Sequence, residues 1–118
     1  MDLIRRGTVE SINYQEGTVR IVQEDRDNAL SFDLPLNSFE YDPPNLNDMV
    51  IAVFLSDSTQ GFIISKPYNN ANRPINGRKG IIRKDYDTDA FIEYDKMTKT
   101  LTIQAQHILF KGNVLAAE

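Results

Sequence analysis

The sequence contains no cysteine and no tryptophan, and it has a single histidine, His107. Without cysteine the fold has no disulfide bond, and no thiolate is available as a nucleophile or as a metal ligand. These absences exclude thiol catalysis and disulfide-stapled folds. They leave the compartment open, because a cysteine-free chain tolerates both reducing and oxidising surroundings.

Long apolar runs are also missing. No segment approaches the roughly 20 apolar residues that a membrane-spanning helix needs. The first residues, Met1 to Arg6, lack the apolar core of a secretory signal. We therefore expect a protein without a signal peptide that is made in the cytoplasm.

The charge is distributed unevenly. Residues 1–70 carry 5 Lys and Arg against 11 Asp and Glu, residues 71–80 carry 3 basic and no acidic residues, and residues 81–118 carry 5 and 6. Proteins bind DNA and RNA through Lys and Arg that neutralise phosphates. A first segment with a net charge of −6 therefore predicts no nucleic-acid partner. An OB-fold nucleic-acid-binding protein remains the alternative function.

Short alternating segments predict an all-β fold. We expect five strands in residues 1–70, at 8–12, 18–22, 29–34, 49–55 and 62–65, with Gly17 at positive φ in the first hairpin turn and Pro35 ending the third strand. Five short strands in about 70 residues fit a small closed barrel of OB type, and an SH3-like barrel is the alternative architecture.

Alternation also predicts which side chains fill this barrel. Phe62 lies in an apolar strand and is expected inside, whereas Phe39 and Tyr41 lie in a loop. The main core prediction comprises Val9, Val19, Ile21, Leu30, Phe32, Leu34, Val50, Ala52, Phe54 and Ile63.

The remaining chain divides into a linker and a short β-rich stalk. Residues 71–80 are rich in Asn and Gly and predict a linker. Residues 81–118 predict strands at 90–94, 100–105 and 108–110, with a hairpin at 95–99. Because Leu101 and Ile103 are odd-numbered while Ile108 and Phe110 are even-numbered, we expect a bulge near His107 or a change of sheet face.

The stalk is too short to fold alone. Segments below roughly 40 residues rarely do so without disulfides, metals or oligomerisation, and this one has about 38 residues and no cysteine. We therefore expect self-association through its apolar side chains. The predicted interface residues are Ile92, Tyr94, Leu101, Ile103, Ile108 and Phe110.

Few residues suggest chemistry. Asp85, Asp87 and Asp89 are ligand types suited to Ca²⁺, but they lack the glycine and the bidentate glutamate of an EF-hand and fit solvated turn carboxylates better. The sole histidine has no serine partner at a plausible spacing, so no nucleophile–base pair can be assembled. We expect no enzymatic activity and no cofactor.

The motifs nevertheless follow a recognisable order. They are Gly7-Thr8-Val9, Thr18-Val19-Arg20-Ile21, Leu34-Pro35, the turn from Pro44 to Val50, Gly61 to Ile64 followed by Tyr68, Phe91 to Asp95, and Leu101 to Ile103. This series resembles the phage baseplate assembly protein V family, the tail-spike proteins of contractile phages and phage-tail-like bacteriocins. Asn47 and Ser65 stand where the family usually has Gly, and the His-x-His pair that holds a metal at the tip of some members is missing.

The resemblance implies an OB-fold-like barrel followed by a short trimeric β-helix or β-prism stalk. It implies a homotrimer that forms the central structural spike of a contractile tail or tail-like particle baseplate, below the tail tube, where it meets or pierces the cell envelope. The implied partners are the tail hub or tube, other baseplate proteins and a separate tip protein.

Two further hypotheses concern the same assembly. Three-fold symmetry would gather three copies of His107 as a metal site, although a polar residue at a phase change is the simpler interpretation. An adaptor that joins particle proteins without piercing is a third hypothesis for the function.

Overall fold

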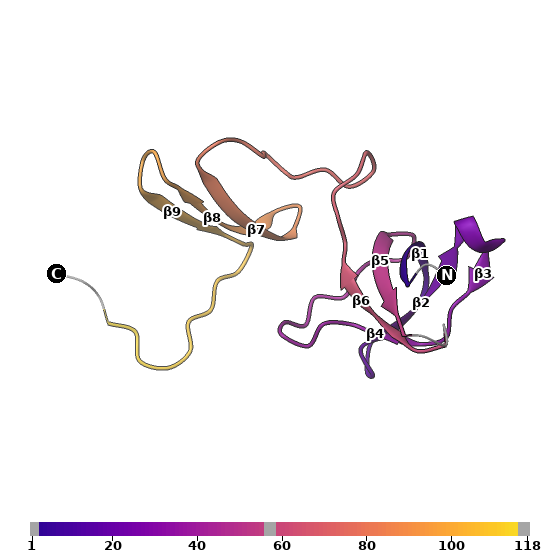
Figure 1. Ribbon diagram of the computed structural model, residues 1–118. Coiled ribbons are helices and arrows are strands. Elements are labelled where there is room, and N and C mark those ends of the chain that lie inside the picture. Colours follow the sequence, from indigo (N-terminus) through magenta and orange to yellow (C-terminus); the bar gives the residue numbers. More distant parts are fainter. Residues whose placement is uncertain (1–2, 56–58, 116–118) are drawn as a thin grey trace. The chain divides into compact units, whose positions relative to one another are not determined.

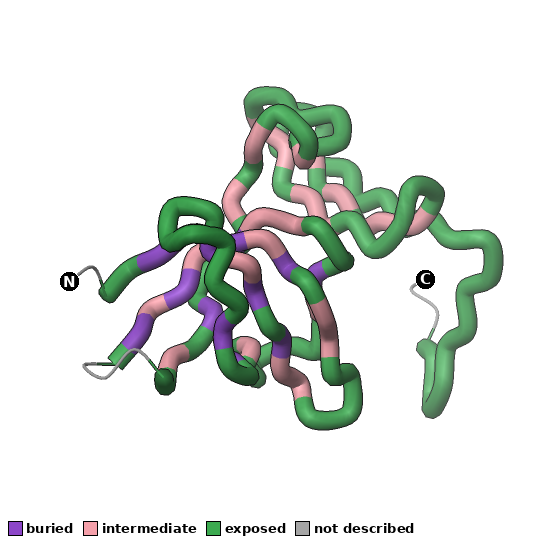
Figure 2. Tube along the Cα trace, turned by 90° about the vertical axis from the view of Figure 1, so that its right-hand side faces the viewer, coloured by how far each residue is buried: buried purple, intermediate pink, exposed green. Residues whose placement is uncertain are grey.

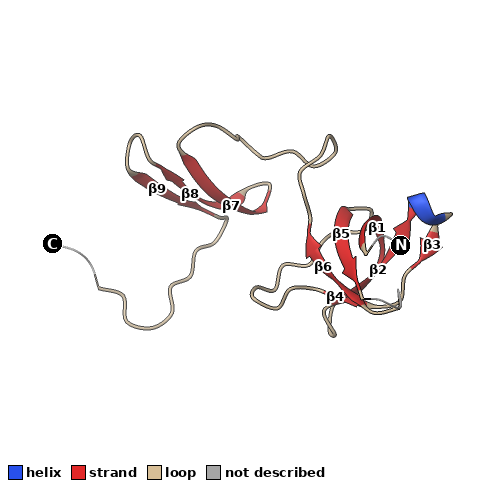
Figure 3. Ribbon diagram, in the orientation of Figure 1, coloured by secondary structure: helices blue, strands red, loops and turns tan. Residues whose placement is uncertain are grey.

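The computed structural model describes residues 3–55 and 59–115 of a chain that forms two compact units, Met1–Ala71 and Asn72–Glu118 (Figure 1). The fold is all-β, and each unit contains its own antiparallel sheet. The described residues form no α-helix; the single helical element is a 3-10 turn, η1 (Glu24–Arg26), which lies between β2 and β3 (Figure 3).

The described residues of the first unit form six strands. Their order in the sheet is β3-β2-β1-β5-β6, and β4 also pairs with β2. The strands are β1 (Ile4–Asn13), β2 (Thr18–Gln23), β3 (Ala29–Leu30), β4 (Leu34–Pro35), β5 (Met49–Phe54) and β6 (Gly61–Ser65). The first half of β1 pairs with β5 and the second half pairs with β2.

Two features of β1 allow it to pair with both β2 and β5. Its register with β2 shifts between Val9 and Ser11, a bulge of the kind that bends a strand and increases its twist. At Gly7 an added Cβ would lie 2.6 Å from Cδ1 of Ile21. The absence of a side chain at Gly7 therefore leaves the space that Ile21 occupies.

The core of the first unit comes from alternate strand positions. Figure 2 shows the buried segments in this unit. The buried apolar residues are Val9, Val19, Ile21, Leu34, Val50, Ala52, Phe54 and Ile63, all of them predicted. At one end the buried Arg5 lies over the Phe54 ring, with its guanidinium carbon 4.3 Å from the ring centroid, and donates a hydrogen bond of 3.1 Å to Gln23.

The core prediction is wrong for two of its ten residues. Leu30 is 49% exposed and Phe32 is 62% exposed. The expected strand at 29–34 is interrupted, because the backbone N–H of Ile21 donates to the Ser31 hydroxyl at 2.9 Å and the Ser31 N–H donates back to the Ile21 carbonyl. Ser31 therefore occupies the inner side and its two apolar neighbours face outward.

The prediction that Phe62 lies inside the first unit is also wrong. It is 42% exposed, because β6 alternates so that Ile63 faces the core and both its neighbours face outward. Gly61 is held next to β5, where an added Cβ would overlap the Val53 carbonyl oxygen. Gly17 has φ 70°, as predicted, and Asn47, which stands where the resembled family usually has Gly, has φ 71°. Part of the turn expected between β5 and β6, residues 56–58, lies outside the described residues.

The sheet does not form a closed barrel. β4 and β6 lie in contact, but in the described part of the chain no ladder of hydrogen bonds joins them. A seam therefore separates these two strands, and the closed barrel expected from strand count is not observed.

The described residues of the second unit form a three-stranded meander. Its strands are β7 (Ile81–Asp87), β8 (Ala90–Asp95) and β9 (Thr100–Gln104), in the order β7-β8-β9. The hairpin between β8 and β9 was predicted and is closed by Asp95, whose carboxylate accepts from the Met97 N–H at 2.9 Å. β7 was not predicted. The strand expected at 108–110 is wrong, because β9 ends at Gln104 and residues 105–115 form no strand or bulge.

The contrast between Phe54 and Phe62 gives a direct test of the core. Phe54→Ala removes a ring that is almost fully buried and should destabilise the first unit by about 3–5 kcal/mol. Phe62→Ala, one strand away on the outer side, should cost less than about 1 kcal/mol. Urea denaturation of both variants measures the difference, and equal losses would contradict the strand phases described here.

Candidate functional site

The second unit presents one apolar face. In an antiparallel sheet, residues that pair directly lie on the same face. Ile82 pairs with Tyr94 and Tyr94 with Leu101, which makes one row across the three strands. In the neighbouring row Lys84 pairs with Ile92, and Ile92 pairs with Ile103. The apolar face is defined by Ile82, Ile92, Tyr94, Leu101 and Ile103, each of which is exposed.

The opposite face is polar and better covered. The Arg83 guanidinium donates to Glu93 at 2.9 Å and to Asp85 at 2.8 Å, and it lies 3.7 Å from the centroid of the Phe91 ring. Arg78, from the segment before β7, reaches Glu93 at 3.4 Å. Hydrogen bonds and ion pairs therefore cover the charged face, whereas no described residue of the second unit covers the apolar face in this way.

These contacts shift the pKa of the Glu93 carboxyl. The hydrogen bond from Arg83 holds the pKa of the Glu93 carboxyl below its ordinary value; partial burial acts in the opposite direction, and the charge of Arg78 lowers the pKa further. Glu93 is thus kept ionised at the centre of the polar face, where it links two arginines.

Burial differs sharply between the two units. None of the residues described in 72–115 is buried, and Figure 2 shows this unit in the colours of intermediate and exposed residues. A three-stranded sheet gains stability by covering an apolar face. In a single chain, this face lacks that contribution from its own unit.

The structure brings four of the six predicted interface residues together. Ile92, Tyr94, Leu101 and Ile103 lie on the apolar face. Ile108 and Phe110 lie beyond β9, outside the sheet, and both are exposed. Ile82 is an addition that the sequence analysis missed because β7 was not recognised, although the pair Ile81-Ile82 directly after Gly80 was an available signal.

Among the described residues, those considered for metal binding are not gathered into a ligand group. Asp85 accepts from Arg83, and the Asp87 carboxylate accepts from the Thr88 N–H at 2.8 Å, as turn carboxylates do. His107 is exposed in the segment after β9. Within the described ranges no group of three His, Asp or Glu side chains is placed to hold a metal ion.

Comparison with protein-family models and curated proteins does not identify a family for this chain. Neither the protein-family models nor the curated proteins give a match to this chain. The resemblance to contractile-tail spikes therefore rests on the ordered motifs alone. In the part of the chain that the structure describes, no helix has the length and apolar character needed to cross a membrane.

The lowered pKa of Glu93 predicts a pH dependence for the second unit. A carboxyl whose pKa is lower in the folded chain stabilises it at pH values above the unfolded pKa, about 4.3 for Glu, and this stabilisation is lost as pH falls through the folded pKa. The second unit should therefore lose stability as the pH falls below about 4.3, and Glu93→Gln should flatten that loss.

Amide NMR signals of β8, followed from pH 6 to pH 3, measure this effect. Glu10→Gln, which removes an exposed carboxylate of the first unit, is the matched control. An unchanged pH dependence in Glu93→Gln would refute the role assigned to the Arg83–Glu93 pair.

Proposed function

We propose that this chain is the central spike of a contractile phage tail or tail-like particle. In this role it forms a homotrimer, with the first unit as a barrel-like base and the second unit as a short stalk that meets the cell envelope. The observation that carries the proposal is the exposed apolar face of a unit without a buried residue in its described part.

The energetics of the apolar face favour self-association. A large apolar side chain contributes about 1.5–3 kcal/mol when it becomes fully buried. Each of the five side chains on the face retains a third or more of its accessible surface, so each still has part of that energy to gain. Three copies around one axis would turn three such faces into a shared core. A trimer thereby gives the stalk the core that a single chain lacks.

The first unit is compatible with an OB-like base. The OB fold is a five-stranded, partly open Greek-key barrel. Here the long strand β1 pairs with both β2 and β5, and β4 approaches β6 without forming a ladder. We infer that the first unit is a barrel of this kind with an open seam. Its net charge of −6 over residues 1–70 disfavours the alternative role of binding nucleic acid.

The position of the apolar face yields a test of the trimer. The full chain should be a trimer by native mass spectrometry, and Leu101→Lys should convert it to monomers because it brings three charges into one apolar core. Thr102→Lys adds the same charge to the same strand, but on the opposite face, beside Glu93. It should leave the trimer intact. A monomeric wild-type chain, or equal effects of both lysines, would reject the proposal.

Truncation separates the contributions of the two units. A chain of residues 1–80 retains the whole core of the first unit and lacks β7, β8 and β9. It should fold and be monomeric at micromolar concentration, as measured by sedimentation at several dilutions. If it stays as tightly trimeric as the full chain, the first unit holds the trimer and the stalk surface serves another partner.

A further inference from the structure

Asn76 and Gly77 form an exposed turn in the segment of the second unit that precedes β7. Asn76 is the only asparagine of the sequence that is followed by a glycine. The side-chain amide of asparagine is chemically labile, because the backbone nitrogen of the next residue can attack its Cγ atom. A following glycine makes this attack easiest, since no β-carbon shields that nitrogen or restricts the backbone beside it. Asn76 is therefore the asparagine most open to this reaction.

Among the described residues, no hydrogen bond holds either of the two reacting groups. The Asn76 side chain and the Gly77 N–H take part in none. The backbone of Asn76 has φ 54°, in the left-handed region that residues with a side chain adopt at some cost. The side chain can therefore rotate toward the Gly77 nitrogen without breaking a hydrogen bond, and the backbone offers little resistance to leaving its present conformation.

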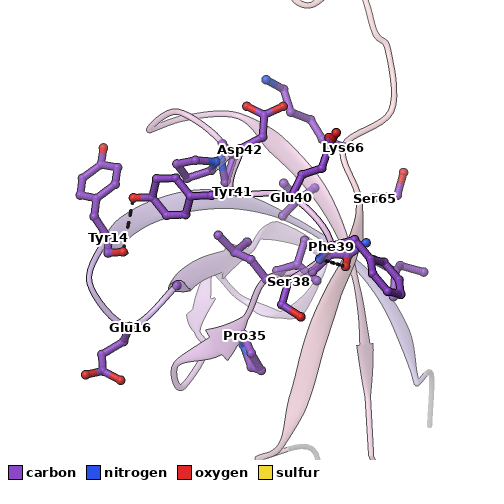
Figure 4. Close-up of a pocket in the computed structure, with 18 of the residues that line it drawn as sticks. Tyr14, Glu16, Pro35, Ser38, Phe39, Glu40, Tyr41, Asp42, Ser65 and Lys66 are labelled. Atoms are coloured by element: carbon purple, nitrogen blue, oxygen red, sulfur yellow. Dashed lines mark hydrogen bonds between the residues drawn. The ribbon is translucent and has the colours of Figure 1, made fainter. Parts of the chain in front are cut away.

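Asn37 shows the opposite arrangement and serves as a comparison within the same chain. It precedes Ser38, a small residue that also leaves its nitrogen accessible. However, the Asn37 side-chain oxygen accepts the Phe39 N–H at 2.9 Å, beside the pocket of the first unit (Figure 4). A bond of this kind fixes an asparagine side chain to the backbone two residues further on. Asn37 must break it before its Cγ atom can be attacked.

Arg78 is placed to favour loss of the proton from the Gly77 nitrogen. Its guanidinium donates to the Asn76 carbonyl at 3.0 Å and also reaches Glu93 at 3.4 Å. That carbonyl belongs to the same peptide group as the Gly77 N–H. A cation that draws electron density from the oxygen stabilises the deprotonated form of the peptide group, which is the form that attacks.

We propose that Asn76 is a site of spontaneous deamidation. The Gly77 nitrogen loses its proton to hydroxide and forms a bond to Cγ of Asn76, while the side-chain nitrogen takes a proton from water and leaves as ammonia. The product is a cyclic imide. Water then opens the imide at either carbonyl, and the residue becomes aspartate or iso-aspartate. The modification concerns the covalent chain alone and stands independently of the proposed spike.

The product carries a new carboxylate on the residue that Arg78 already contacts. Arg78 is about half exposed, and its ion pair with Glu93 is the longer of the two that Glu93 makes, since Arg83 donates to Glu93 at 2.9 Å. The new carboxylate therefore competes for Arg78 at close range. Deamidation should draw Arg78 toward position 76 and leave Glu93 with Arg83 alone.

Incubation of the full chain at pH 6 and at pH 9, followed by peptide mapping with mass spectrometry, tests the proposal. Asn76 should convert several-fold faster at pH 9, because hydroxide removes the proton, and the product should become a substrate for an iso-aspartate-specific methyltransferase. Asn37 should stay an amide in the folded chain and should react only when the chain is unfolded in guanidinium chloride. If Asn76 converts only in the unfolded chain, or if Asn37 converts first, the proposal is overturned.

Two variants test the contribution of Arg78. Arg78→Gln should slow the conversion several-fold in the folded chain and leave it unchanged in guanidinium chloride, where the contact with the carbonyl is lost. Lys79→Gln removes the same charge from the next residue, which is exposed, and should have a smaller effect. Equal rates in the folded wild-type chain and in Arg78→Gln would refute the role assigned to this arginine.

Asn76→Asp reproduces the charge of the product and tests its effect on Glu93. The amide NMR signal of Glu93 should shift in this variant. Asn113→Asp, which changes an exposed asparagine beyond β9, should leave that signal in place. An unshifted Glu93 signal in Asn76→Asp would show that Arg78 stays with Glu93 after deamidation.

Discussion

The first unit depends on the way β1 is shared between two neighbours. One half of this strand pairs with β5 and the other with β2, so the sheet can curve around a single small core. Sharing requires the bulge after Val9 and the missing side chain at Gly7, since Ile21 fills the space in front of that glycine. The packing of β2, β4 and β5 around Ile21 and Phe54 follows from this arrangement.

The two units distribute their polar and apolar side chains differently. The first encloses eight apolar residues in a core and leaves acidic side chains at the surface. In the second, Arg83 and Glu93 are the better covered side chains, whereas the row through Tyr94 faces outward. A sheet with this distribution resembles half of an interface more than a complete domain, because interface cores are apolar and their charges lie at the rim.

Much of the fold followed from alternation in the sequence. Eight of the ten predicted core residues are buried, because strict alternation fixes which side of a strand faces inward. Leu30 and Phe32 were misplaced because the Ser31 hydroxyl binds the β2 backbone, an interaction that hydrophobicity does not reveal. β7 was overlooked because it is rich in charged residues, of which Arg83 and Asp85 lie on the polar face of the sheet. The open seam could not be foreseen, since it depends on how closely β4 approaches β6.

Among the described residues β9 pairs with β8 alone, so its other edge is open to pairing with another chain. Its five residues, Thr100–Gln104, include no charge and no proline, and all of them are exposed. Natural sheets usually protect such edges with lysine, proline or a bulge. Edge-to-edge pairing has no point at which it must stop, unlike association around a closed symmetry axis, and it leads toward fibrils. Formation of the proposed trimer would therefore compete with open-ended polymerisation, and the outcome would depend on the local concentration of newly made chains.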